Sequence, residues 1–165
     1  MEPNMQKYSL TKEQVYDLVD KSSYGVVSTI GEDGYPYGAP VNIVRVGGDF
    51  YFHGRKRGEK VFNIARDPRV CLTVVEDGGF ENFGPDACNT TAAYRSAVIR
   101  GRAVEVTDEG KKSEMLHALI ERIVPERSED PMNEKMVAAA IVFKIVPENI
   151  TGKYHEPSPG NRIMR

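Results

Sequence analysis

The spacing of apolar residues along this chain predicts strands more often than helices. Gly47-Gly48 lies between two strand-like segments and predicts a hairpin, and Gly101 inside a long β-prone run indicates a bulge or a close backbone approach. Pro147 is expected to end the last strand, and the stretch from Asp77 to Thr91 is expected to be a loop. The β-branched and aromatic residues that favour strands collect in six segments, 24–30, 37–46, 49–53, 69–76, 94–106 and 139–146.

Three segments carry the signals of helices instead. Thr11, followed by Lys-Glu-Gln, has the spacing of a capping box, so a short helix is expected to end before Ser22-Ser23. A second helix is expected over 58–66, and a third over 109–123 after Asp108, a residue type that caps helices. With so few helices, a mainly β fold of about six antiparallel strands, a barrel with peripheral helices, is favoured over a doubly wound parallel sheet. The chain also lacks the Gly-x-Gly-x-x-Gly motif of Rossmann folds.

Length and composition indicate a single domain. The chain has 165 residues, of which 40% are apolar, enough for one sizeable core but not for two. We expect the domain to cover residues 1–165, with its core at about 11–153 and a polar C-terminal tail at 154–165. Pro157 and Pro159 argue against regular structure in that tail.

Charge and cysteine content narrow the expected partners. The net charge of −2 gives no overall attraction to nucleic acid, so no nucleic-acid partner is expected. The chain shows neither a signal-peptide pattern nor an apolar stretch long enough for a bilayer, so we expect a cytoplasmic protein without a membrane partner. The two cysteines and three histidines have no metal-ligand spacing, and no metal site is expected.

The most informative segment is a cluster of cations that follows an aromatic strand. After His53-Gly54 come Arg55, Lys56, Arg57 and Lys60, placed around Gly58 where the second helix is expected to begin. The free N–H groups at a helix N-terminus attract anions, and neighbouring cations strengthen that attraction. This pattern predicts a phosphate site. The alternative is an ordinary solvated basic loop before a surface helix.

Several motifs in this order resemble the pyridoxamine 5'-phosphate oxidase-like flavoproteins, and most closely their nitroimidazole-resistance (Nim-type) branch. The resemblance extends from about Tyr24 to Lys153. It implies an FMN-binding split β-barrel that forms a homodimer, with FMN in a groove between the subunits and FAD as an alternative flavin. The motifs are Asp33-Gly34-Tyr35-Pro36-Tyr37-Gly38-Ala39-Pro40-Val41, Tyr51-Phe52-His53-Gly54, Gly58-x-Lys60, Asp67-Pro68-Arg69-Val70-Cys71, Tyr94-Arg95-Ser96-Ala97-Val98 and Ile150-Thr151-Gly152-Lys153.

The resemblance also implies roles for individual residues. Lys60 and Arg55 would hold the phosphate, although Glu59 stands where the oxidase branch has a basic residue, which leaves the second cation open between Arg55 and Arg57. His53 would lie near the reactive face of the flavin and act as a proton donor, or else serve only as a structural histidine at a strand end. The implied cofactor-binding set is Pro40, Val41, Asn42, Phe52, His53, Gly54, Arg55, Arg57, Gly58, Lys60, Tyr94 and Ser96, the last two reaching the cofactor of the partner subunit.

The function that the resemblance implies is a flavin-dependent oxidoreductase. It would take electrons from NAD(P)H and reduce a small acceptor such as a nitroimidazole or another nitroaromatic compound. Two alternatives stay open at this point. One is pyridoxamine 5'-phosphate oxidase-type activity, and the other is a flavin- or haem-binding module without catalysis.

Overall fold

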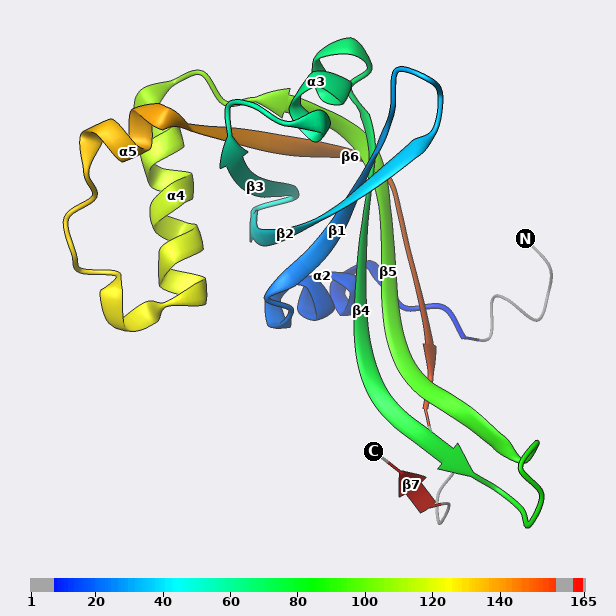
Figure 1. Cartoon of the computed structure of the whole chain (residues 1–165). Helices are drawn as coiled ribbons and strands as arrows, with labels where there is room; N and C mark the ends of the chain where they lie inside the picture. Colours follow the sequence, from blue (N-terminus) through cyan, green and yellow to red (C-terminus); the bar gives the residue numbers. More distant parts are fainter. Residues whose placement is uncertain (1–7, 157–161, 165) are drawn as a thin grey trace.

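Six strands close into an antiparallel barrel in the computed structural model, which describes residues 8–156 and 162–164 (Figure 1). The strands are β1 (Tyr24–Ile30), β2 (Pro36–Val46), β3 (Asp49–Arg55), β4 (Arg69–Asn82), β5 (Thr90–Glu105) and β6 (Ala140–His155). They follow the order β1-β2-β3-β6-β5-β4 around the sheet, and β1 closes the ring by pairing with β4 from Val26–Thr73 to Ser28–Cys71. The predicted fold class is therefore confirmed.

The barrel interior holds the main hydrophobic core. Ile43, Phe52 and Ile145 are inaccessible to solvent, and the ring of Phe52 stacks on Phe143 with 5.3 Å between the centroids. Burial of such side chains stabilises the fold by about 25 cal/mol per Å² of apolar surface. Because side chains alternate along a strand, the inward position of Phe52 directs His53 to the outer face of β3.

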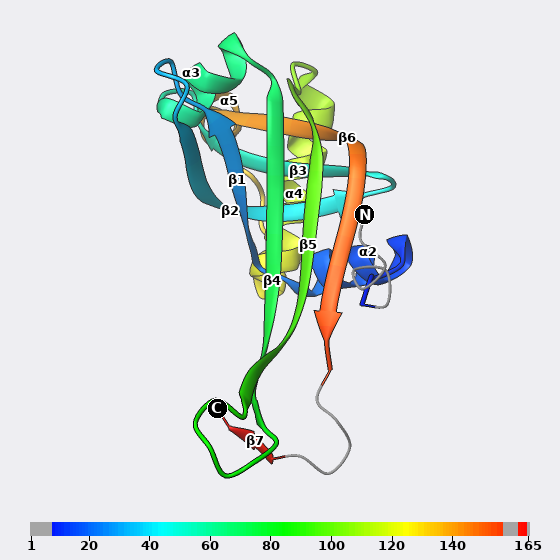
Figure 2. The same cartoon turned by 90° about the vertical axis from the view of Figure 1, so that its right-hand side faces the viewer.

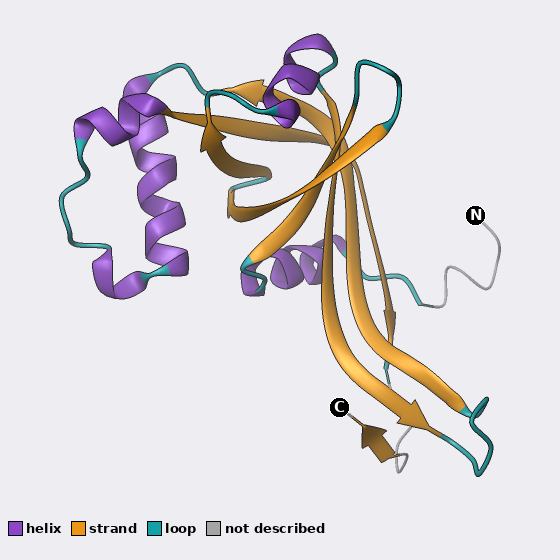
Figure 3. Ribbon diagram, in the orientation of Figure 1, coloured by secondary structure: helices purple, strands orange, loops and turns teal. Residues whose placement is uncertain are grey.

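Within the residues that the structure describes, four helices lie outside the strands (Figure 3). They are α2 (Lys12–Lys21), α3 (Glu59–Arg66), α4 (Glu109–Ile123) and α5 (Glu134–Ala139), and a short 3₁₀ turn, η1 (Pro125–Arg127), follows α4. The predicted capping box is confirmed, since the Thr11 hydroxyl accepts from the N–H of Gln14 and the Gln14 side chain accepts from the N–H of Thr11. Helix α2 adds Val15, Leu18 and Val19 to the barrel core.

Helix α4 packs against the outer face of the sheet. Its residues Met115 and Leu119 are buried against Val44 of β2, Tyr51 of β3 and Val142 of β6, which form a second, smaller hydrophobic cluster. The outer face of β3 is therefore covered up to Tyr51 and becomes accessible at His53. Helix α5 lies next to α4 and leads directly into β6.

The predicted loop from Asp77 to Thr91 is wrong at both ends. Strands β4 and β5 continue beyond the barrel as a two-stranded arm, and residues 83–89 alone connect them (Figure 2). The turn-forming residues make a bulge instead of ending the strand: Gly79 has a φ of 85°, and its N–H donates to the Asp77 carboxylate at 2.8 Å.

The predicted end of the last strand at Pro147 is also wrong, since β6 continues to His155. Pro147 lies opposite Gly101 at a bulge, where its missing N–H costs no ladder hydrogen bond. A Cβ on Gly101 would lie 2.2 Å from the Val146 carbonyl oxygen, which confirms the predicted close approach.

The expectation that the tail lacks regular structure is wrong as well. Besides the end of β6, a short strand β7 (Arg162–Met164) pairs with the outer end of β4 (Figure 2). Pro157 and Pro159, on which that expectation rested, lie outside the described residues. Across the described part of the chain, no helix combines the length and apolarity that crossing a membrane requires.

Candidate functional site

The cation cluster lies where β3 ends and α3 begins. Strand β3 extends through Arg55, two residues further than predicted, and Gly58 precedes α3. Gly58 has a φ of 137°, a conformation that side-chain-bearing residues rarely adopt, and no side chain caps the helix. The first N–H groups of α3 are thus free to receive an anion.

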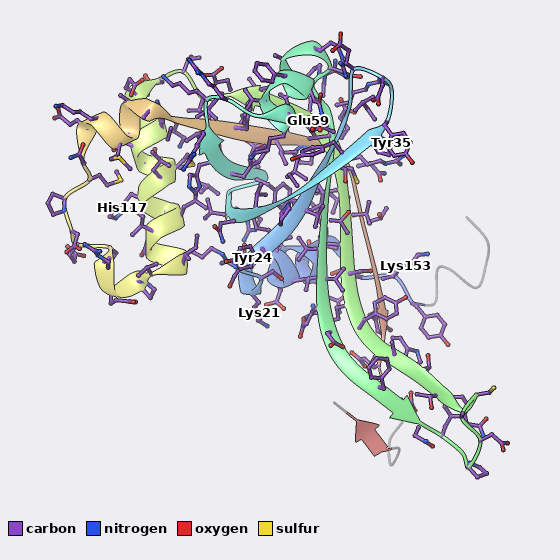
Figure 4. All side chains as sticks on the ribbon, in the orientation of Figure 1. Lys21, Tyr24, Tyr35, Glu59, His117 and Lys153 are labelled. Carbon is purple, nitrogen blue, oxygen red and sulfur yellow. The ribbon has the colours of Figure 1, made fainter. Side chains whose placement is uncertain are left out.

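The four cations of this cluster have no acidic partners. Within residues 8–156 and 162–164, none of Arg55, Lys56, Arg57 and Lys60 forms an ion pair or a side-chain hydrogen bond. The first three are exposed, whereas Lys60 is half-buried. The positive charge gathered here is therefore available to a ligand. Glu59, labelled beside α3 in Figure 4, is exposed and is the acidic residue within the cluster.

Lys60 is positioned by Gly54. Its Nζ and Cε atoms each lie 3.3 Å from the place that a Cβ on Gly54 would occupy. The absence of a side chain at Gly54 lets the ammonium group settle over the end of β3 instead of extending into solvent. The predicted pairing of Gly54 and Lys60 in one site is consistent with this arrangement.

Strands β2 and β3 separate next to the cation cluster. Their ladder runs from Val46–Asp49 to Ile43–Phe52 and stops there, so residues 40–42 and 53–55 face each other without pairing. Asn42 donates its side-chain amide to the Ser23 carbonyl oxygen at 3.0 Å. Val41 and Phe52 have buried side chains and can offer a ligand only their backbone groups.

His53 stands at this opening with its ring unpaired. Among the described residues it forms no hydrogen bond or ion pair. Burial of the ring lowers the pKa of His53 below its usual 6.5, and the nearby charge of Lys60 lowers it further. Part of the residue remains in contact with solvent. The imidazole is neutral at pH 7, with one nitrogen able to donate and the other able to accept.

Tyr94 and Ser96 lie in a different part of the subunit. They are on β5 and pair with His155 and Lys153 of β6, and Tyr94 lines a separate pocket of about 290 Å³. Figure 4 shows Lys153 well away from Glu59. The ten other predicted residues thus lie on β2, on β3 and at the junction of β3 with α3, whereas Tyr94 and Ser96 lie on β5.

A second pocket behind His53 was missed at the sequence level. It has a volume of about 490 Å³, and it lies between α4, α5 and the strands β3 and β6. The one signal in the sequence is Asn133, whose side chain caps α5 by accepting from the N–H groups of Lys135 and Met136. Helix α5 has only six residues, and so short a segment gives too little periodic pattern for the helix to be predicted. The pocket beside it therefore could not be predicted either.

Comparison with solved structures agrees with this geometry, whereas none of the curated proteins compared with the chain matches it. Among solved structures, a proposed 5-nitroimidazole antibiotic resistance protein of Bacteroides thetaiotaomicron has 21% identity and a TM-score of 0.73 over 88% of this chain and 85% of its own. The flavocytochrome Anf3 of Azotobacter vinelandii has 24% identity and a TM-score of 0.82 over 95% and 73%. An FAD and heme binding protein of Mycobacterium smegmatis has 25% identity and a TM-score of 0.81 over 94% and 77%.

These likenesses to solved structures agree with the barrel fold described above. The sequence profile described as pyridoxamine 5'-phosphate oxidase matches residues 11–154, which include the whole cation cluster and nearly all of the barrel. The chain belongs to the pyridoxamine 5'-phosphate oxidase family.

Proposed function

We propose that this protein is a flavin-dependent oxidoreductase that uses FMN and electrons from NAD(P)H to reduce a small acceptor such as a nitroimidazole. The observation that carries the proposal is the set of four cations without acidic partners at the uncapped start of α3. A terminal phosphate dianion matches such a set, because charge-assisted hydrogen bonds are the strong ones. A bound flavin supplies hydride acceptance and electron delivery that amino-acid side chains lack.

The residues around the opening suit the rest of such a cofactor. Backbone groups of Pro40, Val41 and Asn42 on β2 and of His53 and Gly54 on β3 do not pair with each other beyond the Ile43–Phe52 pair, so they can bond the polar edge of a flat ring. Lys60, with Arg55 or Arg57, would bind the phosphate with the N–H groups near Gly58. His53 would hold a proton beside the ring.

The exposed face of the barrel favours a homodimer. Tyr24 and Val26 on β1, Val75 on β4 and Val98 on β5 are 65%, 40%, 62% and 37% exposed, and they lie on adjacent strands. Contiguous apolar surface of this kind marks interaction sites. Because Ser96 shares β5 with Val98, a second copy docked here would place Tyr94 and Ser96 close to the boundary between the subunits.

This dimer can be tested by its mass. Val75→Lys is expected to shift the protein from dimer to monomer in light scattering, since it buries a charge in the interface. Val104→Lys, at the far end of β5 and 51% exposed, is the matched control and should leave the dimer intact. A wild-type monomer at every concentration would refute the dimer.

Activity is tested by NAD(P)H-dependent reduction of a nitroimidazole by the FMN-loaded protein. Turnover well above that of free FMN is expected, and a rate equal to free FMN would refute the proposal. The cofactor released on denaturation, identified by chromatography, decides between FMN and FAD.

A haem-binding module is the second candidate, and one observation favours it. His53 presents an unpaired, neutral imidazole to a largely apolar pocket, a setting that suits an axial haem ligand. The absorption spectrum of the purified protein separates the two candidates, because haem shows a Soret band and flavin does not. Pyridoxamine 5'-phosphate oxidase activity is disfavoured, because the one arginine or lysine lining that pocket, Arg127, already pairs with Asp130 at 2.7 Å.

A further inference from the structure

The pocket behind His53 is built from elements outside the barrel. Helix α4 contributes Leu116 and Ile120, the connection to α5 contributes Met132, and α5 contributes Val137, while His53 and Ala140 form the wall on the sheet side. Figure 3 shows α4 and α5 standing beside β3 and β6 with the connecting loop between them. The volume of about 490 Å³ lies within the range of about 300–1,000 Å³ that is usual for small-molecule sites.

The two charged side chains of this pocket pair with each other, and the side-chain oxygen of Asn133 is also bonded. Arg127 Nε and the Asp130 carboxylate are 2.7 Å apart, so their charges compensate each other. The Asn133 side-chain oxygen accepts from two N–H groups of α5. Among the described residues, His53 is the one polar side chain of the lining that has no partner.

The character of the lining sets the chemistry of the occupant. Once bound FMN neutralises the cation cluster, a charged ligand in this pocket would leave water without meeting a free counter-charge, which is costly as a general rule. An uncharged ring compound would bury its apolar surface and could exchange one hydrogen bond with the imidazole. The exposed rim side chain Met136, 71% accessible, would gain apolar contact at the same time.

We infer that this pocket is the acceptor site, and that it selects uncharged, ring-sized compounds carrying one hydrogen-bonding group, such as neutral nitroaromatics. The inference rests on the proposed function, because His53 belongs both to the opening beside the cation cluster and to the pocket wall. An occupant of the pocket therefore lies directly beside the position proposed for the flavin ring.

Calorimetric titration with nitrobenzene tests the pocket in the full-length protein, before and after saturation with FMN. Val137→Trp fills the pocket and is expected to weaken nitrobenzene binding by at least about tenfold, the range that a misfit in an apolar site produces. Ala138→Trp, one residue further along α5 and exposed, is the matched control and should change binding less than about twofold. The affinity for FMN is expected to be the same in both variants.

The anion 4-nitrobenzoate extends the test, since it keeps the ring and the nitro group but adds a charge. In the FMN-saturated protein it is expected to bind at least about tenfold more weakly than nitrobenzene. Equal binding of the two compounds, or unchanged nitrobenzene binding in Val137→Trp, would overturn the inference. A Soret band that disappears in Val137→Trp would also overturn the inference, because it would identify haem as the occupant of the pocket. Nitrobenzene binding seen only when the protein is diluted to monomers would overturn it as well, because a second copy of the chain would then fill the pocket.

The two proposals fail in different ways. If the protein binds nitrobenzene as expected but takes up no flavin, the ligand class proposed for the pocket is supported and the oxidoreductase function is refuted. A protein that binds FMN and reduces nitrobenzene equally well in wild type and in Val137→Trp keeps the oxidoreductase and loses this acceptor site.

Discussion

Removing the charge of Lys60 should weaken FMN binding and leave riboflavin binding unchanged. Lys60 is half-buried and held over Gly54, so its ammonium group is already close to the free N–H groups of α3. Riboflavin has the same ring and ribityl chain as FMN but lacks the phosphate. A comparison of the two ligands therefore isolates the contribution of the phosphate.

The magnitude follows from the partial burial of Lys60. Two unit charges about 4 Å apart attract each other by roughly 4 kcal/mol at an effective dielectric constant of about 20. Solvent around a half-exposed group reduces this value, and hydrogen bonds to charged groups contribute about 1.5–3 kcal/mol net. Lys60→Ala should thus raise the Kd for FMN about 10- to 150-fold.

Quenching of flavin fluorescence measures both affinities. Lys56→Ala is the matched control, since Lys56 belongs to the same cluster but is exposed and is not one of the residues proposed to bind the phosphate, and its effect should stay below about threefold. The loss in Lys60→Ala should also shrink at high salt. An equal loss in both variants, or an equal loss of riboflavin binding, would refute a specific phosphate contact.

Three further contacts each carry a measurable consequence. The pKa of His53, followed by NMR, should lie below 6.5 and rise in Lys60→Ala without reaching that value, since burial persists; a pKa that does not move would refute the coupling. Because a lowered pKa means that the unfolded chain binds the proton more readily, His53 should reduce stability as the pH falls below about 6.5. Arg122→Met removes the donor to two carbonyl oxygens at the end of α2, at 3.0 and 2.7 Å, and should lower the free energy of unfolding by about 1–3 kcal/mol in urea; an unaltered midpoint would contradict this. Gly101→Ala should cost about 3 kcal/mol or more, because its Cβ would lie 2.2 Å from a carbonyl oxygen, whereas Gly110→Ala within α4 should be neutral or stabilising; equal melting temperatures would count against the close approach.

The sequence predicts the barrel well where local pattern decides the structure. Strands β1, β2 and β3 alternate inward and outward residues, and their connections carry turn-forming glycines, so their positions follow from the chain itself. The continuation of β6 through Pro147 does not, because it depends on Gly101 lying opposite, more than forty residues earlier. Likewise, the Gly-rich segment after Asp77 has the sequence of a loop, and only its pairing with β5 shows that it continues β4.

The candidate site divides in the same way. The cation cluster could be predicted because its members are adjacent in sequence and precede a helix. The pocket could not be predicted, because His53 on β3 is far in sequence from α4 and α5 and lies beside them only in the folded chain. Tyr94 and Ser96 pose a different problem, because the pattern of one chain does not say which surface a partner subunit covers.

The proposed function depends on the cations at the end of β3, which would neutralise the terminal phosphate of a bound flavin. Phosphorus NMR of the FMN-loaded protein observes that phosphate directly as the pH is changed. Bound to Arg55 and Lys60, the phosphate should stay dianionic well below the pH at which free FMN takes up a proton, and the double variant Arg55→Ala/Lys60→Ala should lose this protection. A bound phosphate that titrates like free FMN in the wild-type protein would contradict the account.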